Sequence, residues 1–164
     1  MIDVRAAVRS QLIPIDSDNL ILPNTAIAEV IYYQEPEPVS GGPAWLLGVL
    51  SWRDRSIPLV CFELASGQPQ PAANPQVKIA VLNALGGNPE LSFFAIVTQR
   101  LPQLSLIDET RIAAIEHEIE KTPLILSRVI INGEPAIIPN LDTLEAMLLD
   151  CKKAWLRRKR KGAA

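Results

Sequence analysis

The stretch that decides the fold is WLLGVLSWRDRSIPLVCFEL, which covers residues 45–64. Two apolar runs, at residues 45–52 and 57–64, flank the polar segment Arg-Asp-Arg-Ser at residues 53–56. Apolar runs of this length that are rich in branched and aromatic residues and are joined by a short polar turn are typical of a β-hairpin. The sequence therefore predicts two antiparallel strands with a turn at residues 53–56.

Two residues inside these strands carry positional information. Gly48 interrupts the first apolar run, and a glycine within a strand often marks a bulge or a close approach of another backbone. Pro58 lies in the second run and cannot donate a ladder hydrogen bond. We therefore expect Pro58 near the start of its strand or on a sheet edge.

Similar apolar runs continue on both sides of this hairpin, with few helical crossovers between them. The Asn132-Gly133 pair favours positive φ at both turn positions, as a two-residue type I′ hairpin turn requires. A Pro-rich segment at residues 66–75 separates the two halves of the chain. Further strands are expected at residues 11–15, 20–23, 24–33, 77–85, 91–99, 101–107, 124–131 and 134–141.

Two segments show helical spacing instead. Isoleucines recur at helical intervals within residues 108–121, with charged residues between them, which predicts a short amphipathic helix. A second helix is expected at residues 142–158, with Asp142 or Thr143 as its N-cap. The apolar stripe of this second helix consists of Leu144, Met147, Leu148 and Cys151.

The composition favours a folded, mostly β protein. The chain has 164 residues, of which 48% are hydrophobic and 14 are prolines, and prolines in such number argue against a helical bundle. The net charge of −2 is uneven, because residues 151–164 carry seven basic and no acidic residues. The remaining nine basic residues face eighteen acidic ones in residues 1–150, so an acidic body precedes a basic tail.

The sequence offers no constellation that would run a reaction or hold a metal. His117 is the one histidine, and Cys61 and Cys151 are the one pair of cysteines, far apart in the sequence. Phosphate-binding, dinucleotide-binding and hydrolase motifs are missing. We therefore expect no enzymatic activity, no cofactor and no metal, and a buried free thiol at Cys61. The N-terminus has no long apolar core and no apolar run reaches 18 residues, so we expect a cytoplasmic protein without a membrane span.

Two features leave alternatives open. The basic residues of segment 152–161 could bind an anionic membrane or nucleic acid, or they could simply complement the carbonyl end of the last helix. The aromatic residues Tyr32, Tyr33, Trp45 and Trp52 lie near Arg53 in the sequence. Such residues either build the core or anchor a protein interface.

Residues 20–67 resemble the first subdomain of CheW-like coupling proteins. The resemblance rests on the order and spacing of several pieces, followed by a closing hairpin and helix at residues 131–148, INGEPAIIPNLDTLEAML. Those pieces are AIAEVI (26–31), EPEPVSGGP (35–43), WLLGVL (45–50), SWRD (51–54), IPLVCFEL (57–64) and ASG (65–67). The chain departs from the family pattern at Ser51, Trp52, Asp54 and Cys61. It looks like a divergent member, similar to the ChpC-like proteins of pilus-associated chemosensory systems.

The resemblance implies two small SH3-like, five-stranded β-barrel subdomains that share a core, at about residues 11–67 and 76–141. It also implies an adaptor that binds the regulatory domain of a CheA-type histidine kinase and the cytoplasmic tips of chemoreceptors. Catalysis, a cofactor and a small-molecule substrate are not part of the family's function.

By position, the resemblance implies that Ile27, Glu29, Gly48 and Arg53 contact partners. Trp52 and Pro58 are the other two residues of the expected interaction site. Gly48 would let a partner backbone come close, and Pro58 would limit the pairing of an edge strand with other chains. Because an unpaired buried guanidinium would be costly, Arg53 is expected to reach solvent with its stem along Trp52. Asp54 is expected to hold Arg53 as a surface ion pair.

Overall fold

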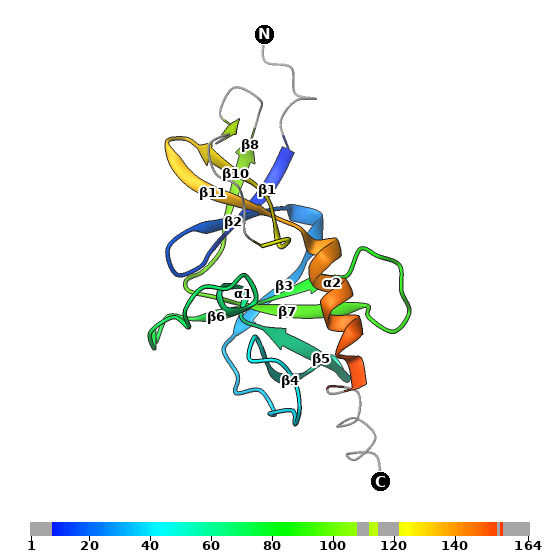
Figure 1. Cartoon of the computed structure of the whole chain (residues 1–164). Coiled ribbons are helices and arrows are strands. Elements are labelled where there is room, and N and C mark those ends of the chain that lie inside the picture. Colours follow the sequence, from blue (N-terminus) through cyan, green and yellow to red (C-terminus); the bar gives the residue numbers. More distant parts are fainter. Residues whose placement is uncertain (1–7, 108–111, 115–121, 154, 156–164) are drawn as a thin grey trace.

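A computed structural model of the chain describes residues 8–107, 112–114, 122–153 and 155. These residues form two β-sheets and a C-terminal helix, which begins near the first of them and runs alongside the other (Figure 1). The fold is thus mostly β, as the sequence predicts.

The first sheet has six strands, taken from both sides of the Pro-rich connector. Its order is β8 (Gln103–Ile107), β1 (Val8–Pro14), β2 (Asn19–Pro23), β11 (Glu134–Pro139), β10 (Ile125–Ile131) and β9 (Ile112–Ala114). All neighbours are antiparallel except β2 and β11, which meet in a short parallel contact between Leu20 and Ile137.

The second sheet has five strands, which also come from both sides of the Pro-rich connector, so neither sheet follows the expected division at about residues 11–67 and 76–141. Its order is β3 (Ile27–Tyr32), β6 (Lys78–Asn83), β7 (Phe93–Thr98), β5 (Arg55–Val60) and β4 (Leu46–Trp52). Although β3 and β4 are its two edges, the chain just after β3 pairs back onto β4. Glu37 and Val49 exchange two backbone hydrogen bonds of 2.9 Å each. The sheet therefore curls until its edges meet.

Three apolar clusters hold these layers together. One lies inside the curl of each sheet, around Leu59 in the second and Val129 in the first. The largest lies between the sheets and is sealed by helix α2 (Leu141–Asp150), whose Leu144 and Leu148 are fully buried. The indole of Trp155, only 3% exposed, joins this shared core and donates a hydrogen bond to the carbonyl of Leu148.

Helix α2 is fastened by polar contacts that the sequence pattern did not predict. Its N-cap is Asn140, whose side chain accepts a hydrogen bond from the N–H of Thr143, so the expected cap at Asp142 or Thr143 is wrong. Glu145 is buried, and its two carboxylate oxygens accept hydrogen bonds from the backbone N–H groups of Leu85 and Gly86. A carboxylate paired in this way can be buried without an unsatisfied charge.

Three other local predictions need correction. Ile112–Ala114 is strand β9, not helix, because these residues pair with β10 and Ile112 packs in the first sheet's interior; the rest of segment 108–121 lies outside the described residues. The returning strand ends at Val60, and Phe62–Ala65 forms the short helix α1, which buries Phe62. A 3₁₀ turn, η2 (Asn24–Ala26), precedes β3.

Candidate protein-docking site

One carboxylate ties the tip of the β4–β5 hairpin to strand β3. Glu29 Oε2 accepts a hydrogen bond from the indole N–H of Trp52, with an oxygen–nitrogen distance of 2.6 Å. The same oxygen lies 3.5 Å from Nη2 of Arg53. Because Glu29 lies on one edge strand and Trp52 on the other, these contacts join the two edges at one end of the curled sheet. Glu29 thereby fixes both side chains.

Arg53 is held in one place while most of its side chain stays in solvent. Arg53 and Asp54 have φ values of 46° and 61°, which is the geometry of a type I′ turn. The guanidinium carbon of Arg53 lies 4.7 Å from the ring centroid of Trp52, and 64% of the side chain is exposed. The prediction that Arg53 is exposed and lies along Trp52 is confirmed. The expected pairing with Asp54 is wrong, because the carboxylate beside Arg53 is that of Glu29.

The stack continues beyond Trp52 to residues that the sequence did not single out. The rings of Trp52 and Phe93 are 4.9 Å apart between centroids and are tilted by 59°. The guanidinium carbon of Arg55 lies 5.1 Å from the Phe93 ring centroid. The hairpin thus carries two arginines, each held against an aromatic ring. Phe93 belongs to β7, and only the tertiary fold reveals that it lies beside this hairpin.

Gly48 serves the fold at this position. A Cβ on Gly48 would lie 2.4 Å from the carbonyl oxygen of Glu37, and Gly48 has a φ of 151°. The β4–β5 register shifts between Leu46 and Gly48, so the expected bulge and close backbone approach are both present. The approaching backbone is the chain's own, and Gly48 is buried. The backbone of Glu37 therefore occupies the space beside Gly48 that a partner backbone would need.

Ile27 and Pro58 lie apart from the Glu29 cluster. Ile27 is half-buried and packs against the shared core. Pro58 is buried on β5, which lies between β4 and β7, so its expected place on an edge strand is wrong. Proline is tolerated there because the register with β7 begins only at Leu59. Of the six expected site residues, the structure brings together Glu29, Trp52 and Arg53.

A buried carboxyl and thiol lie together near helix α1. Glu63 is 1% exposed; its Oε2 accepts a hydrogen bond of 3.0 Å from the N–H of Asp16, and its Oε1 lies 3.8 Å from the Cys61 sulfur. Burial raises the pKa of the Glu63 carboxyl, and the hydrogen bond from Asp16 partly opposes that rise. Burial likewise raises the pKa of the Cys61 thiol, which keeps it protonated and unreactive. The expected buried free thiol at Cys61 is confirmed.

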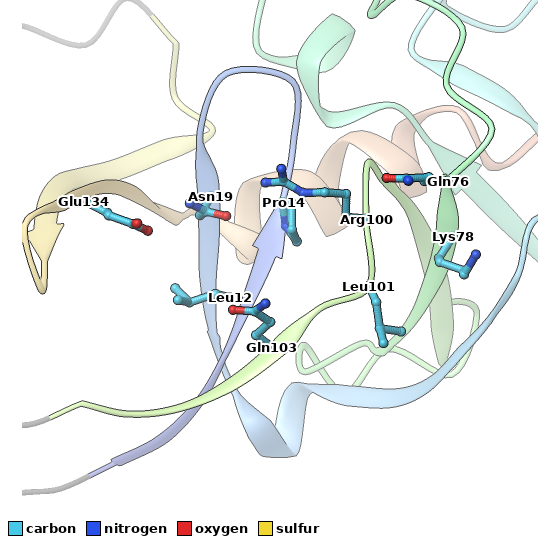
Figure 2. A pocket seen from close by; sticks show the side chains of 9 residues that line it. All are labelled: Leu12, Pro14, Asn19, Gln76, Lys78, Arg100, Leu101, Gln103 and Glu134. Atoms are coloured by element: carbon cyan, nitrogen blue, oxygen red, sulfur yellow. The ribbon is translucent and has the colours of Figure 1, made fainter.

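An open pocket of about 620 Å³ lies where the two sheets meet (Figure 2). Leu12, Pro14 and Asn19 line it from the first sheet, and Lys78 and Arg100 from the second sheet and the chain that leaves it. Its charged side chains are of both signs, since Glu134 lies across from Arg100 in Figure 2. Chemically it is a mixed polar groove without a convergent set of catalytic groups.

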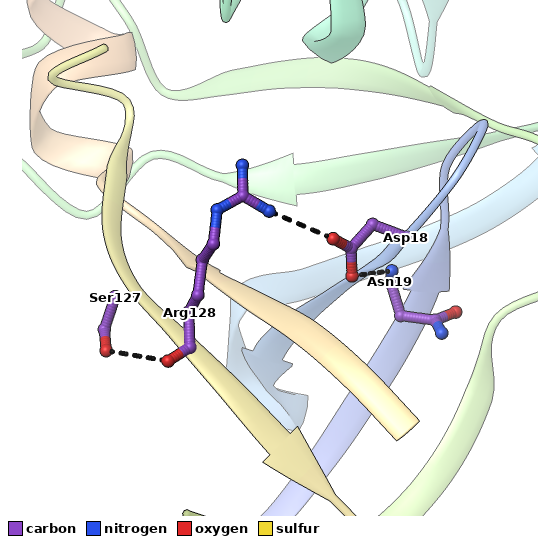
Figure 3. A network of polar contacts seen from close by, with 4 residues as sticks. All are labelled: Asp18, Asn19, Ser127 and Arg128. Atoms are coloured by element: carbon purple, nitrogen blue, oxygen red, sulfur yellow. Dashed lines mark hydrogen bonds and ion pairs between the residues drawn. The ribbon is translucent and has the colours of Figure 1, made fainter. Parts of the chain in front are cut away.

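The β1–β2 turn and strand β10 of the first sheet are joined by an ion pair. Arg128 Nη1 lies 3.2 Å from Asp18 Oδ2, and both side chains are largely buried (Figure 3). The other carboxylate oxygen of Asp18 accepts a hydrogen bond from the N–H of Asn19. Partly buried charges with several partners hold a fixed geometry, so this pair rigidifies the sheet.

Three further observations concern metal binding, membrane-crossing helices and the basic segment at residues 152–161. Within the part of the chain that the structure describes, no three His, Cys, Asp or Glu side chains gather closely enough to ligate a metal. None of the described helices has the length and apolar character needed to cross a membrane. Of the basic segment's residues, Lys152 forms an ion pair with Glu90 and Trp155 is buried in the core.

Known proteins resemble the chain in both sequence and structure. The family model described as CheW-like domain matches residues 10–147. The structure is similar to the crystal structure of the scaffolding protein TtCheW from Thermoanaerobacter tengcongensis, with a TM-score of 0.69 and 15% sequence identity. The similarity covers 82% of this chain and 84% of that protein. The sequence matches no curated protein.

Proposed function

This chain belongs to the CheW-like domain family, and on that premise we propose that it links chemoreceptors to a CheA-type histidine kinase. The family's members are non-enzymatic scaffold proteins of chemotaxis signalling, so the chain acts by docking and not by catalysis. The partners on this proposal are the regulatory domain of the kinase and the cytoplasmic tips of the receptors. That role places the protein in the cytoplasm.

The observation that carries the proposal is the Glu29–Trp52–Arg53 cluster. It presents a guanidinium that is both exposed and fixed, by an aromatic ring on one side and a carboxylate on the other. A pre-positioned arginine loses little freedom on binding and can form paired hydrogen bonds to a partner carboxylate. Arginine and tryptophan are also the side chains most often found at the energetic centre of interfaces. We assign docking to this cluster.

We extend the proposal to a pilus-associated chemosensory pathway that controls twitching motility. The support is the altered hairpin, where the indole of Trp52 reaches Glu29 and the tip carries two arginines. A changed tip implies a changed partner surface, as in a specialised adaptor. Deleting the gene should then abolish twitching while flagellar swimming persists. Loss of swimming with normal twitching would assign the protein to an ordinary chemotaxis pathway.

Direct assembly tests the adaptor function. The purified full chain, the regulatory domain of a CheA-type kinase from the same organism and a receptor-tip fragment are mixed and separated by size-exclusion chromatography. We expect one complex that contains all three, and no kinase–receptor complex of equal stability when the chain is left out. If the chain elutes alone with every such kinase and receptor of the organism, the proposed function is wrong.

A further inference from the structure

Four side chains on the inner face of the curled second sheet meet at one end of it. Trp52 lies directly opposite Arg55 in the β4–β5 pairing, and Glu29 lies opposite Val81 in the β3–β6 pairing. Directly opposite residues share one face of a sheet, and both Trp52 and Val81 belong to the sheet's interior cluster. Phe93, the first residue of β7, packs against the same cluster. Strands from both sides of the Pro-rich connector therefore supply the residues at this end.

Contacts between these residues form a continuous series that leads to Arg53. The guanidinium of Arg55 lies over the Phe93 ring, and that ring packs against Trp52 with 4.9 Å between the centroids. The guanidinium of Arg53 lies over the Trp52 ring in turn, at 4.7 Å from its centroid. The position of the Arg53 guanidinium therefore depends on the orientation of the Trp52 ring.

Two contacts of different kinds hold the Trp52 ring. The hydrogen bond to Glu29 fixes its nitrogen, but a single hydrogen bond leaves the ring able to turn about that atom. Packing against a second aromatic ring fixes its plane, because aromatic pairs prefer a defined relative orientation. Phe93 supplies this second contact, and without it the surface on which Arg53 lies would have no fixed orientation.

We propose that Phe93 is a positioning residue of the docking cluster of Glu29, Trp52 and Arg53. It fixes the plane of the Trp52 ring and thereby holds the Arg53 guanidinium where the partner binds it. Phe93 is half-buried beneath the exposed Arg55, so this role requires no contact between Phe93 and the partner. The inference rests on the proposed adaptor function, in which a pre-positioned Arg53 loses little freedom on binding.

The neighbouring residue Phe94 provides a matched control. Adjacent residues of a strand point to opposite faces, so Phe93 faces the interior of the second sheet and Phe94 faces the shared core. Phe94 is fully buried, whereas Phe93 is half-buried. Leucine at either position removes the same ring, and stability alone would predict the larger effect at Phe94.

Titration calorimetry of the kinase regulatory domain into the full chain tests the effect on binding. Phe93→Leu should weaken binding about threefold or more. Phe94→Leu should lower the melting temperature further than Phe93→Leu does, yet leave the affinity of the folded protein unchanged. The double variant Arg53→Ala with Phe93→Leu should bind no more weakly than Arg53→Ala alone, because Phe93 acts through Arg53. Additive losses in the double variant, or wild-type affinity in Phe93→Leu, would overturn the proposal.

Hydrogen exchange of the indole N–H groups, followed by NMR, gives a readout that needs no partner. In Phe93→Leu the N–H of Trp52 should exchange about fivefold faster or more, because its ring opens locally. The N–H of Trp155, which is bonded to the Leu148 carbonyl in the shared core, should be unaffected. Equal acceleration at both would indicate a general loss of stability and would overturn the proposal. Failure of the wild type to bind the kinase would refute the proposed function, whereas wild-type binding without these effects would refute the role of Phe93 alone.

Discussion

The carbonyl oxygen of Glu37 occupies the place where a side chain on Gly48 would begin, 2.4 Å from the position of a Cβ. This contact lies beside the paired hydrogen bonds of Glu37 and Val49, which close the second sheet on itself. Closure brings β3 next to β4, and only then can Glu29 reach Trp52 and Arg53. A glycine in the middle of a strand therefore sets up the docking cluster without facing a partner.

Gly48→Ala should destabilise the protein strongly. The added methyl group meets backbone atoms that cannot move aside, and the φ of 151° disfavours any side chain. Overpacking and backbone strain together predict a loss of about 3 kcal/mol in the free energy of unfolding, measured by urea denaturation. Gly41→Ala is the control, because Gly41 has a positive φ of 77° but open space around it. Equal losses in both variants would show that the contact with Glu37 is unimportant.

Two substitutions of Glu29 should separate its contribution to stability from its contribution to partner binding. Glu29→Gln keeps an oxygen that can accept the Trp52 N–H but removes the charge beside Arg53, so we expect unchanged folding and partner binding weakened about threefold. Glu29→Ala also leaves the indole N–H of the buried Trp52 without its partner, which should lower the free energy of unfolding by about 1–2 kcal/mol. Thermal unfolding and titration calorimetry measure the two effects. Identical behaviour of both variants would contradict this division.

Much of the architecture could be predicted from the sequence because it depends on local signals. Polar turns between apolar runs located the hairpins, and the positive φ values of Asn132 and Gly133 match the predicted turn. The three-residue strand β9 was missed because the spacing of isoleucines looks helical, whereas pairing with β10 decides the conformation. Helix α1 was missed because the apolar run at residues 57–64 is typical of one continuous strand, whereas the strand ends at Val60 and Phe62 is buried within the helix.

The docking cluster was only partly predictable, because it depends on which strands become neighbours. The exposure of Arg53 and its contact with Trp52 follow from sequence adjacency and the cost of burying a guanidinium. The link to Glu29, however, requires the sheet to close, and the stack on Phe93 requires β7 to lie beside β5. Pro58 was misplaced because the sequence does not reveal the strand order.

Glu63 should make stability depend on pH. Burial raises the pKa of its carboxyl above the ordinary value of 4.5, so the folded state holds this proton more tightly than the unfolded state. Its favourable contribution is complete below pH 4.5 and declines as pH rises through the folded-state pKa. The stability of the wild type relative to Glu63→Gln should therefore fall as the pH rises above 4.5, measured by urea denaturation. A difference that stays constant or grows with pH would contradict this.

Trp155 should contribute strongly to the stability of the fold, whereas residues 157–164 should contribute little. Removing residues 157–164 should leave the melting temperature and partner binding unchanged, because the removed residues are mostly like charges. Trp155→Ala should instead lower the free energy of unfolding by about 3–5 kcal/mol, since it empties a site in the shared core. Circular dichroism monitors both. Failure of the truncated chain to fold would show that the basic tail is structural.

The central claim is that Arg53, fixed by Glu29 and Trp52, anchors the partner. Titration calorimetry of the kinase regulatory domain into the wild type and into Arg53→Ala, with melting temperatures recorded on the same samples, tests it directly. We predict at least tenfold weaker binding, about 1.4 kcal/mol, with an almost unchanged melting temperature and with Arg100→Ala as an unaffected control. Wild-type affinity in Arg53→Ala, or unfolding of the variant with full affinity in its folded fraction, would contradict the claim.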